Sequence, residues 1–155
     1  MSTRTILEWR VSPFGVLSGA EVYAVMKLRT DVFVVEQQCP YAELDGQDEA
    51  ALHLTGSTGD GRLAAYARIL PPHGDGRPHI GRVVVHPEHR GKGLGTTVMR
   101  EAIRVARERS WNAPIAISAQ AHLQAFYERL GFTCTSGMYV WDGIPHIDME
   151  LTATG

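Results

Sequence analysis

The chain has 155 residues, of which 44% are hydrophobic, and its formal net charge is −2 at neutral pH. One domain commonly takes about 100 to 200 residues, so a single domain over residues 1–155 with one substantial core is predicted. A protein with this net charge lacks the broad positive field of a general nucleic-acid-binding protein, so no nucleic-acid partner is expected. Cys39 and Cys134 lack C-x-x-C spacing, which favours reduced thiols over a disulfide or zinc site.

The distribution of apolar residues along the chain does not predict a membrane protein. The start of the chain contains no apolar run long enough for a secretory signal. Nowhere does the sequence reach the roughly 18 consecutive apolar residues of a membrane span. A cytoplasmic location and no membrane partner are therefore expected.

The hydrophobic pattern predicts an order of elements along the chain. Ser18 or its neighbour is expected to cap the first helix, and the Pro- and Gly-rich stretch 71–78 is expected to be a connection. The predicted strands cover 5–11, 50–55, 62–70, 80–86 and 115–118, the predicted helices cover about 18–36, 94–109 and 121–130, and two closing strands follow.

The segment 83–95 joins a predicted strand to a predicted helix through a basic, glycine-rich turn. The β-branched run Val83–Val85 favours a strand, and from Leu94 onwards apolar residues recur every three or four positions, as on one helical face. Three glycines in the turn leave the backbone N–H groups of the first helical turn open to a ligand. An anion can bind those groups, and Arg90 and Lys92 add positive charge, so the turn is predicted to bind phosphate.

The spacing in this turn does not fit two common phosphate motifs. The nucleoside-triphosphate P-loop needs Ser or Thr directly after its Gly-Lys pair, whereas Gly93 follows Lys92 here. The dinucleotide fingerprint needs a glycine where this chain has Thr96. The run R-G-K-G-L-G at 90–95 instead resembles the coenzyme A pyrophosphate loop of the GNAT acyltransferase superfamily.

Other segments carry the same resemblance over nearly the whole chain. Residues 125–132, A-F-Y-E-R-L-G-F, are similar to the F-Y-x-x-x-G-F signature of the superfamily, with Gly131 placed as a helix C-cap. Residues 28–48, His53 and the tail 142–149 resemble the ElaA-like branch. The chain is therefore identified as a member of that branch.

The resemblance implies a fold, an activity and a set of cofactor contacts. The fold is α/β (α+β), a single GNAT domain with a central, mixed, mostly antiparallel twisted sheet flanked by helices. The activity is acyl transfer, acetyl-CoA being the donor and a primary amine of a small molecule or protein the acceptor, with no metal. Gln120 stands where many members carry Asn. The implied coenzyme A contacts are Val83, Val84, Val85, Arg90, Gly91, Lys92, Gly93, Leu94, Gly95, Thr96, Gln120 and Phe126.

Tyr127 is the candidate catalytic residue that assists the departing sulfur, because the family's matching tyrosine points at it. A thiol titrates near pH 8.5 and a tyrosine near pH 10, so we expect a hydrogen bond rather than full proton transfer. A purely structural role, packing beside Phe126 and Phe132, is the alternative interpretation.

Glu36 is the first candidate for the catalytic base, because Phe33 and Glu36 are three apart on a predicted helix and share a side of it. His53 and His146 are further candidates, since histidine accepts protons near neutral pH. Acceptor contacts are expected from Phe33, Gln37, His53 and His146.

The remaining polar residues leave alternatives open. Glu43, Asp45 and Asp48 lie in the segment that covers the acceptor side in the resemblance, and each could attract a cationic amine. His86 and His89 have no recognisable third ligand, so they are interpreted as surface residues rather than a metal site.

Two other functions remain open from the sequence. The pattern L-R-x-x-V-F followed by E-L-D-x-x-D is similar to acyl-homoserine-lactone synthases, although those chains are usually longer. A non-catalytic acetyl-CoA sensor or partner-binding module is also compatible, because a fold does not fix a function. The acceptor, the acyl chain length and the oligomeric state are left open, with a homodimer as one option.

Overall fold

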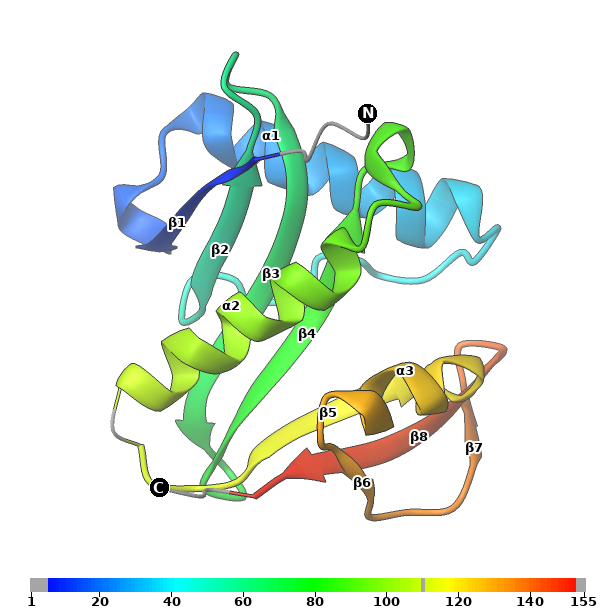
Figure 1. Ribbon diagram of the computed structural model, residues 1–155. Helices are drawn as coiled ribbons and strands as arrows, with labels where there is room; N and C mark the ends of the chain where they lie inside the picture. The colour runs from blue at the N-terminus through cyan, green and yellow to red at the C-terminus, as the bar shows by residue number, and fades with distance from the viewer. Residues whose placement is uncertain (1–5, 110, 153–155) are drawn as a thin grey trace.

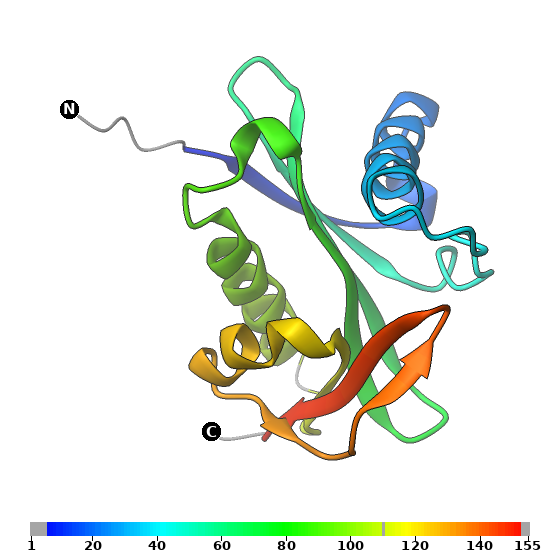
Figure 2. The same ribbon diagram turned by 90° about the vertical axis from the view of Figure 1, so that its right-hand side faces the viewer.

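The computed structural model describes residues 6–109 and 111–152, which form one eight-stranded sheet with helices on both faces (Figures 1 and 2). The strands are β1 (Glu8–Pro13), β2 (Leu52–Ser57), β3 (Leu63–His73), β4 (Arg77–Val85), β5 (Ile115–Gln120), β6 (Thr133–Cys134), β7 (Tyr139–Trp141) and β8 (Ile144–Leu151). The helices are α1 (Gly19–Thr30), α2 (Leu94–Glu108) and α3 (Gln124–Arg129). A π-helix, η2 (Asp31–Glu36), and the short 3-10 turns η1 (Phe14–Val16), η3 (Pro87–His89) and η4 (Ala121–Leu123) complete the elements.

The strands follow the order β1-β2-β3-β4-β5-β8-β6, and β7 also pairs with β8. Every pairing is antiparallel except that of β4 with β5. Figure 2 shows α1 on one face of the sheet and α2 with α3 on the other. The mixed, mostly antiparallel sheet flanked by helices confirms the predicted fold class. Within 6–109 and 111–152, no helix is long and apolar enough to cross a membrane.

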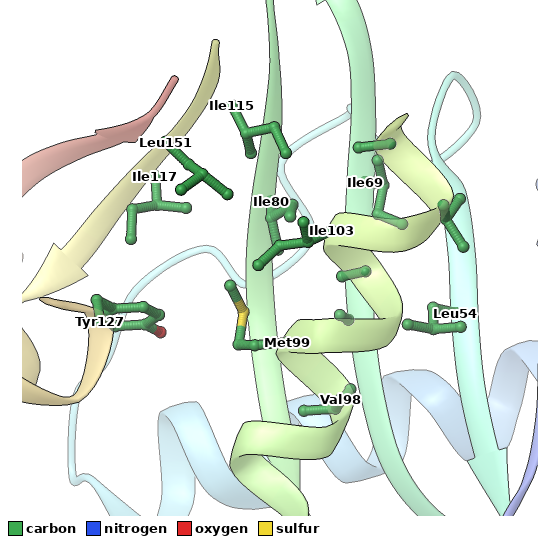
Figure 3. Packing of buried hydrophobic residues seen from close by; sticks show 14 of the residues in the cluster. Leu54, Ile69, Ile80, Val98, Met99, Ile103, Ile115, Ile117, Tyr127 and Leu151 are labelled. Atoms are coloured by element: carbon green, nitrogen blue, oxygen red, sulfur yellow. The ribbon is translucent and has the colours of Figure 1, made fainter. Parts of the chain in front are cut away.

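The main core lies between the sheet and α2, as the helical spacing predicted. Val98, Met99 and Ala102 are completely buried on α2, and they face Leu54 of β2 and Ile80 of β4 within one cluster (Figure 3). Burying a side chain of this size stabilises the fold by roughly 1.5 to 3 kcal/mol relative to its exposure. The core therefore holds the start of α2, and the turn before it, at a fixed place beside β4.

The first helix begins as predicted but changes its hydrogen-bonding pattern before its end. The Ser18 hydroxyl accepts a hydrogen bond from the Glu21 N–H, and the Glu21 carboxylate accepts one from the Ser18 N–H, which is a capping box. The α-helix ends at Thr30, and residues 31–36 form the π-helix η2 rather than further α-helix. Such π segments are common at functional sites because they redirect side chains.

The structure also differs from the predicted elements in three places. Residues 71–78 are not an open connection, because β3 continues to His73 and β4 starts at Arg77, with Gly74 and Gly76 at positive φ in the tight turn between them. The predicted strand 5–11 is observed as Glu8–Pro13, and position 5 lies outside the described residues. Three strands rather than two follow the last helix.

Candidate active site

A bulge in β4 interrupts its pairing with β3. Gly81 pairs with Arg68 and Val84 with Tyr66, so Arg82 and Val83 stand opposite the single residue Ala67. Arg82 has a φ of 51°, which is left-handed and uncommon for a residue with a side chain. The parallel pairing of β4 with β5 is confined to His79 and Ala116 among the described residues. Beyond it, the edge of β4 that faces β5 is free to pair with a ligand.

A cavity of about 750 Å³ opens where β4 and β5 separate. It brings together the end of η2, the turn before α2, and parts of β5, α3 and β8, which are far apart in sequence. Most of the predicted coenzyme A contacts line this cavity: Val83, Val84, Val85, Arg90, Gly91, Gly93, Leu94, Gly95, Gln120 and Phe126. Lys92 and Thr96 do not line it; the Lys92 side chain is exposed to solvent beside the turn.

The turn before α2 has the backbone of an anion-binding site. Gly91 and Gly93 have φ values of 79° and 75°, a left-handed conformation that glycine adopts without strain. Gly93 is the N-cap of α2, and no side chain caps the N–H groups of the first helical turn. Those N–H groups and the positive end of the helix dipole can therefore interact with a phosphate.

The π-helix brings Phe33, Glu36 and Gln37 to the cavity wall, so the predicted shared side of Phe33 and Glu36 is observed. The Glu36 carboxylate, however, forms an ion pair with Arg90 at 2.7 Å. The Gln120 side chain donates a hydrogen bond to the Gln37 side chain at 3.2 Å. Glu36 thus lies at the phosphate turn, where it can position Arg90.

Tyr127 is buried at 8% exposure but still lines the cavity. Its ring packs edge-on against Phe126 and Phe132, with ring centroids 5.0 and 6.0 Å away, so the predicted packing role is observed. The hydroxyl has no hydrogen-bond partner among the described residues, and it is not sealed from solvent. Burial raises the pKa of Tyr127 to about 12, so the hydroxyl keeps its proton at neutral pH and can donate a hydrogen bond to a ligand.

The acidic residues of the loop 41–48 are held by arginines and do not stand free. Arg29 is completely buried and contacts Glu43 at 2.7 Å and Asp48 at 2.6 Å. Arg68 makes a two-pronged contact with Asp45 at 2.9 and 2.8 Å. Arg82 binds Glu43 at 2.8 Å, and the hydroxyl of Tyr41 donates to the same carboxylate. We call these six charged residues, Arg29, Arg68, Arg82, Glu43, Asp45 and Asp48, the arginine–acid network.

The network lowers the pKa of Asp45 and of Asp48 despite their burial, through hydrogen bonds and charge from the arginines. Burial alone would raise the pKa of Asp45, but hydrogen bonds and charge from Arg68, with further charge from Arg82, outweigh it and hold the pKa at about 2. The network contains three positive and three negative side chains. Their ion pairs fix the loop 41–48 onto α1, β3 and β4. These three arginines were not predicted from the sequence, where the placement of Arg29 and Arg68 within apolar segments is the one signal of their burial.

His53 lies away from the cavity, which corrects the expectation that it contacts the acceptor. It is completely buried, and its Nε2–H donates to the Asp48 carbonyl at 2.8 Å. Its Nδ1 accepts from the Tyr66 hydroxyl at 2.7 Å. Burial lowers the pKa of His53, so the ring is neutral and both nitrogens are used inside the protein.

His146, which was predicted to contact the acceptor, lines the cavity from β8. Its Nδ1 lies 2.7 Å from the Ile144 carbonyl oxygen. Cys39 also lines the cavity, and its buried thiol donates to the Asp142 carbonyl at 3.1 Å, joining the loop after η2 to the turn between β7 and β8. Within the described part of the chain, no group of three or more His, Cys, Asp or Glu side chains could hold a metal ion.

The strand bulge, the separated strands and the glycine turn together define an acyl-CoA-dependent acyltransferase of the GNAT type. Residues 19–153 match the sequence model of the family described as an acetyltransferase (GNAT) domain, and the chain belongs to this family. Within the family it is an ElaA-like N-acetyltransferase, since it is 41% identical over 147 residues to protein ElaA of Escherichia coli, covering 93% of this chain and 95% of ElaA.

Solved structures agree with this assignment. An acyl-CoA N-acyltransferase from Pseudomonas aeruginosa is similar with a TM-score of 0.90 and 44% identity, covering 94% of this chain and 99% of that one. The crystal structure of E. coli ElaA is similar with a TM-score of 0.86 and 38% identity, over 94% and 99% of the two chains. The acyl-homoserine-lactone synthase BjaI, at 15% identity, a TM-score of 0.77 and coverage of 96% and 83%, shares the fold alone.

Proposed function

We propose that this protein transfers an acetyl group from acetyl-CoA to a primary amine of a small molecule or protein, by direct attack of the amine on the thioester. The observation that carries the proposal is the single cavity that connects the glycine turn before α2 to the hydroxyl of Tyr127 along the unpaired edge of β4. Family membership supports acyl-CoA as the donor class.

The donor would lie along this edge with its pyrophosphate at the glycine turn and its thioester toward Tyr127. The pyrophosphate binds the N–H groups of the turn, where Arg90 adds a charge. The pantetheine arm pairs with the backbone of Val83–Val85 as an extra strand, because main-chain hydrogen bonds do not depend on side-chain identity. A backbone N–H near Val84 or Val85 then stabilises the negative charge that develops on the thioester oxygen, which is commonly a large contribution to acyl transfer.

Tyr127 assists the departing sulfur by hydrogen bonding. Its pKa is about 12, whereas an ordinary thiol titrates near 8.5, so full proton transfer to the thiolate is uphill by roughly 5 kcal/mol. A hydrogen bond that strengthens as charge develops on the sulfur avoids this cost. The proton of Tyr127 therefore stays on its oxygen while the C–S bond breaks.

Glu36 acts, in this proposal, through Arg90. Its carboxylate holds the Arg90 guanidinium beside the phosphate turn, 2.7 Å away. Because this carboxylate already contacts Arg90, it is held away from an acceptor nitrogen. We therefore assign Glu36 a positioning role instead of the role of general base.

Three wider properties are part of the proposal. We propose that residues 1–155 form one such domain, since the family match begins at residue 19 and β1 adds a strand before it. We propose a cytoplasmic location, because the free thiols of Cys39 and Cys134 suit a reducing compartment. No nucleic-acid or membrane partner is proposed, and a homodimer stays a prediction.

Release of free coenzyme A with a panel of amines tests the proposal. The panel comprises spermidine, tyramine, a peptide with a free lysine and a peptide with a free amino terminus, each with acetyl-CoA. We expect turnover above the background hydrolysis with at least one amine, and the acetylated amine in the mass spectrum. Binding of acetyl-CoA without turnover on any amine would contradict the proposal and favour a sensor.

The acyl-homoserine-lactone alternative has its own reaction. BjaI was solved with S-adenosylmethionine and isopentyl-CoA. Release of coenzyme A from isopentyl-CoA with S-adenosylmethionine, and not with the amine panel, would favour that alternative over the proposed acetyl transfer.

A further inference from the structure

We infer that His146 is the general base that removes the proton from the acceptor nitrogen. His146 lies on β8 directly opposite Gln120 of β5, and both side chains line the same cavity as Tyr127. The inference rests on the proposed function, which supplies the acceptor and the reaction.

The hydrogen bond to Ile144 fixes the tautomer of the ring. A backbone carbonyl oxygen only accepts hydrogen bonds, and it lies 2.7 Å from His146 Nδ1. Nδ1 therefore carries the hydrogen in the neutral ring. The lone pair is then on Nε2, which is the nitrogen that can take a proton.

Two aromatic residues fix the position of the ring. Tyr139 stacks on His146 with a centroid distance of 6.1 Å and an interplanar angle of 24°. Trp141 meets it edge-on with a centroid distance of 5.4 Å. The Tyr139 hydroxyl donates to Asp148 at 2.5 Å, and Ser118 also donates to Asp148, so the stacking ring is itself held in place. A base held in this way loses little freedom on reaching the transition state.

Nε2 of His146 is unpartnered among the described residues and is not sealed from solvent. His146 is 9% exposed and lines the cavity, and Nε2 has no hydrogen-bond partner among the described residues. Within 6–109 and 111–152, two side-chain atoms are sealed from solvent without a hydrogen-bond partner, and they belong to Arg68 and His89. Nε2 of His146 is not one of them. An acceptor nitrogen in the cavity can therefore reach Nε2.

The other carboxylic acids and histidines that line the cavity either pair with a neighbouring charged residue or are exposed to solvent. Glu36 is paired with Arg90, and Asp45 is held by Arg68 within the arginine–acid network. His79 Nε2 lies 3.2 Å from the Asp75 carboxylate. His122 in η4 and Asp142 in the turn before β8 also line the cavity, but both are exposed.

The proton balance of the step is complete. The lone pair of the acceptor nitrogen forms the N–C bond to the thioester carbonyl carbon, and the proton of that nitrogen passes to Nε2 of His146. The C–S bond breaks, and its electron pair leaves with the sulfur, which accepts a hydrogen bond from Tyr127. Water then takes the proton from His146 and restores the neutral ring.

His146→Asn tests the assignment, because the asparagine amide nitrogen takes the place of Nδ1 and no group replaces Nε2. With the panel amines at pH 7, kcat should fall by about 100-fold or more, as for loss of a general base, while acetyl-CoA affinity is unchanged. The matched control is His73→Asn, since His73 Nδ1 also binds a carbonyl two residues earlier, Pro71 at 3.0 Å, but His73 lies outside the cavity.

Nearly normal turnover in His146→Asn would overturn the inference and leave the proposed function intact. A failure of the wild-type protein to release coenzyme A with any amine would instead overturn the proposed function and the base with it. A second measurement needs no acceptor: nitrogen NMR of the His146 ring should report the Nδ1–H tautomer, and an Nε2–H tautomer would refute the assignment.

Discussion

Arg90 Nη1 lies 2.7 Å from Glu36 Oε2, which ties the phosphate turn to the end of the π-helix. Both side chains are 43% exposed, and exposed ion pairs contribute about 0 to 1 kcal/mol. Because Glu36 acts through Arg90 in our account, Glu36→Gln should leave kcat within about threefold of wild type. Acetyl-CoA affinity, measured by calorimetry, should change by a similarly small factor. A loss of kcat above tenfold at unchanged acetyl-CoA affinity would restore Glu36 as a base.

Gly95→Ala tests the cofactor turn without straining the backbone. Gly91 and Gly93 have positive φ, so a side chain at either position strains the backbone even without a ligand. A variant such as Gly93→Val would therefore change the fold as well as the site. Gly95 has no positive φ, and an added Cβ meets the Phe126 ring at an ordinary 3.7 Å. We expect an unchanged or higher Tm, because alanine favours a helix, and about tenfold weaker acetyl-CoA binding from the blocked backbone.

Gly15→Ala is the control for this variant, because Gly15 has open space around it and does not line the cavity. It should bind acetyl-CoA like wild type. Equal affinity of the Gly95→Ala variant would place the pyrophosphate away from this turn.

Tyr127→Phe keeps the packing against Phe126 and removes only the hydroxyl. Loss of a hydrogen bond made chiefly in the transition state should lower kcat by roughly ten- to a hundredfold, with little change in stability or acetyl-CoA affinity. Since the pKa of Tyr127 is about 12, its ionisation should cause no loss of wild-type activity below about pH 10. Equal turnover of variant and wild type, where the chemical step limits the rate, would reduce Tyr127 to a packing residue.

Arg29→Met tests the arginine–acid network through stability. The substitution leaves Glu43 and Asp48 buried with one cation fewer, and breaking a buried pair commonly costs about 3 to 5 kcal/mol. The midpoint of urea unfolding should fall accordingly. Lys27→Met on the same helix is the control, because its pair with Asp31 is exposed on both sides and should be worth less than about 1 kcal/mol.

The same network predicts the acid side of the stability curve. Asp45 has a folded-state pKa of about 2, below its ordinary value of 3.8. Its contribution is therefore fully present above pH 3.8 and is lost as the pH falls toward 2. Urea unfolding between pH 5 and pH 2 should show a steeper loss of stability for wild type than for Asp45→Asn. Parallel curves for the two proteins would contradict the assigned pKa.

Local sequence patterns predicted the parts of the fold that depend on periodicity and on backbone conformation. The buried face of α2 follows from apolar spacing, and the glycine turn follows from the need for left-handed residues at Gly91 and Gly93. The extension of β3 to His73 was missed because Pro71 and Pro72 read as strand breakers. They are accommodated at an irregularity in the pairing between Leu70 and His73, where no ladder N–H is needed.

The site could be predicted only in part, because its polar contacts join residues distant in sequence. No local pattern indicates that Arg29 is paired with Glu43 or Arg90 with Glu36. The π-helix at 31–36 has no sequence signal, yet it sets where Phe33 and Glu36 lie. The choice between His53 and His146 depends on hydrogen-bond partners, since one ring is enclosed by Tyr66 and Asp48 and the other keeps Nε2 open.

The most direct test of the central claim is a crystal structure of the protein with acetyl-CoA or a non-hydrolysable analogue. Our account predicts the pyrophosphate on the backbone N–H groups of the turn 91–95 and the pantetheine arm hydrogen-bonded to the free edge of β4 at Val83–Val85. The thioester sulfur should lie within hydrogen-bonding distance of the Tyr127 hydroxyl. A cofactor bound outside the cavity between β4 and β5, or a sulfur far from Tyr127, would contradict the account.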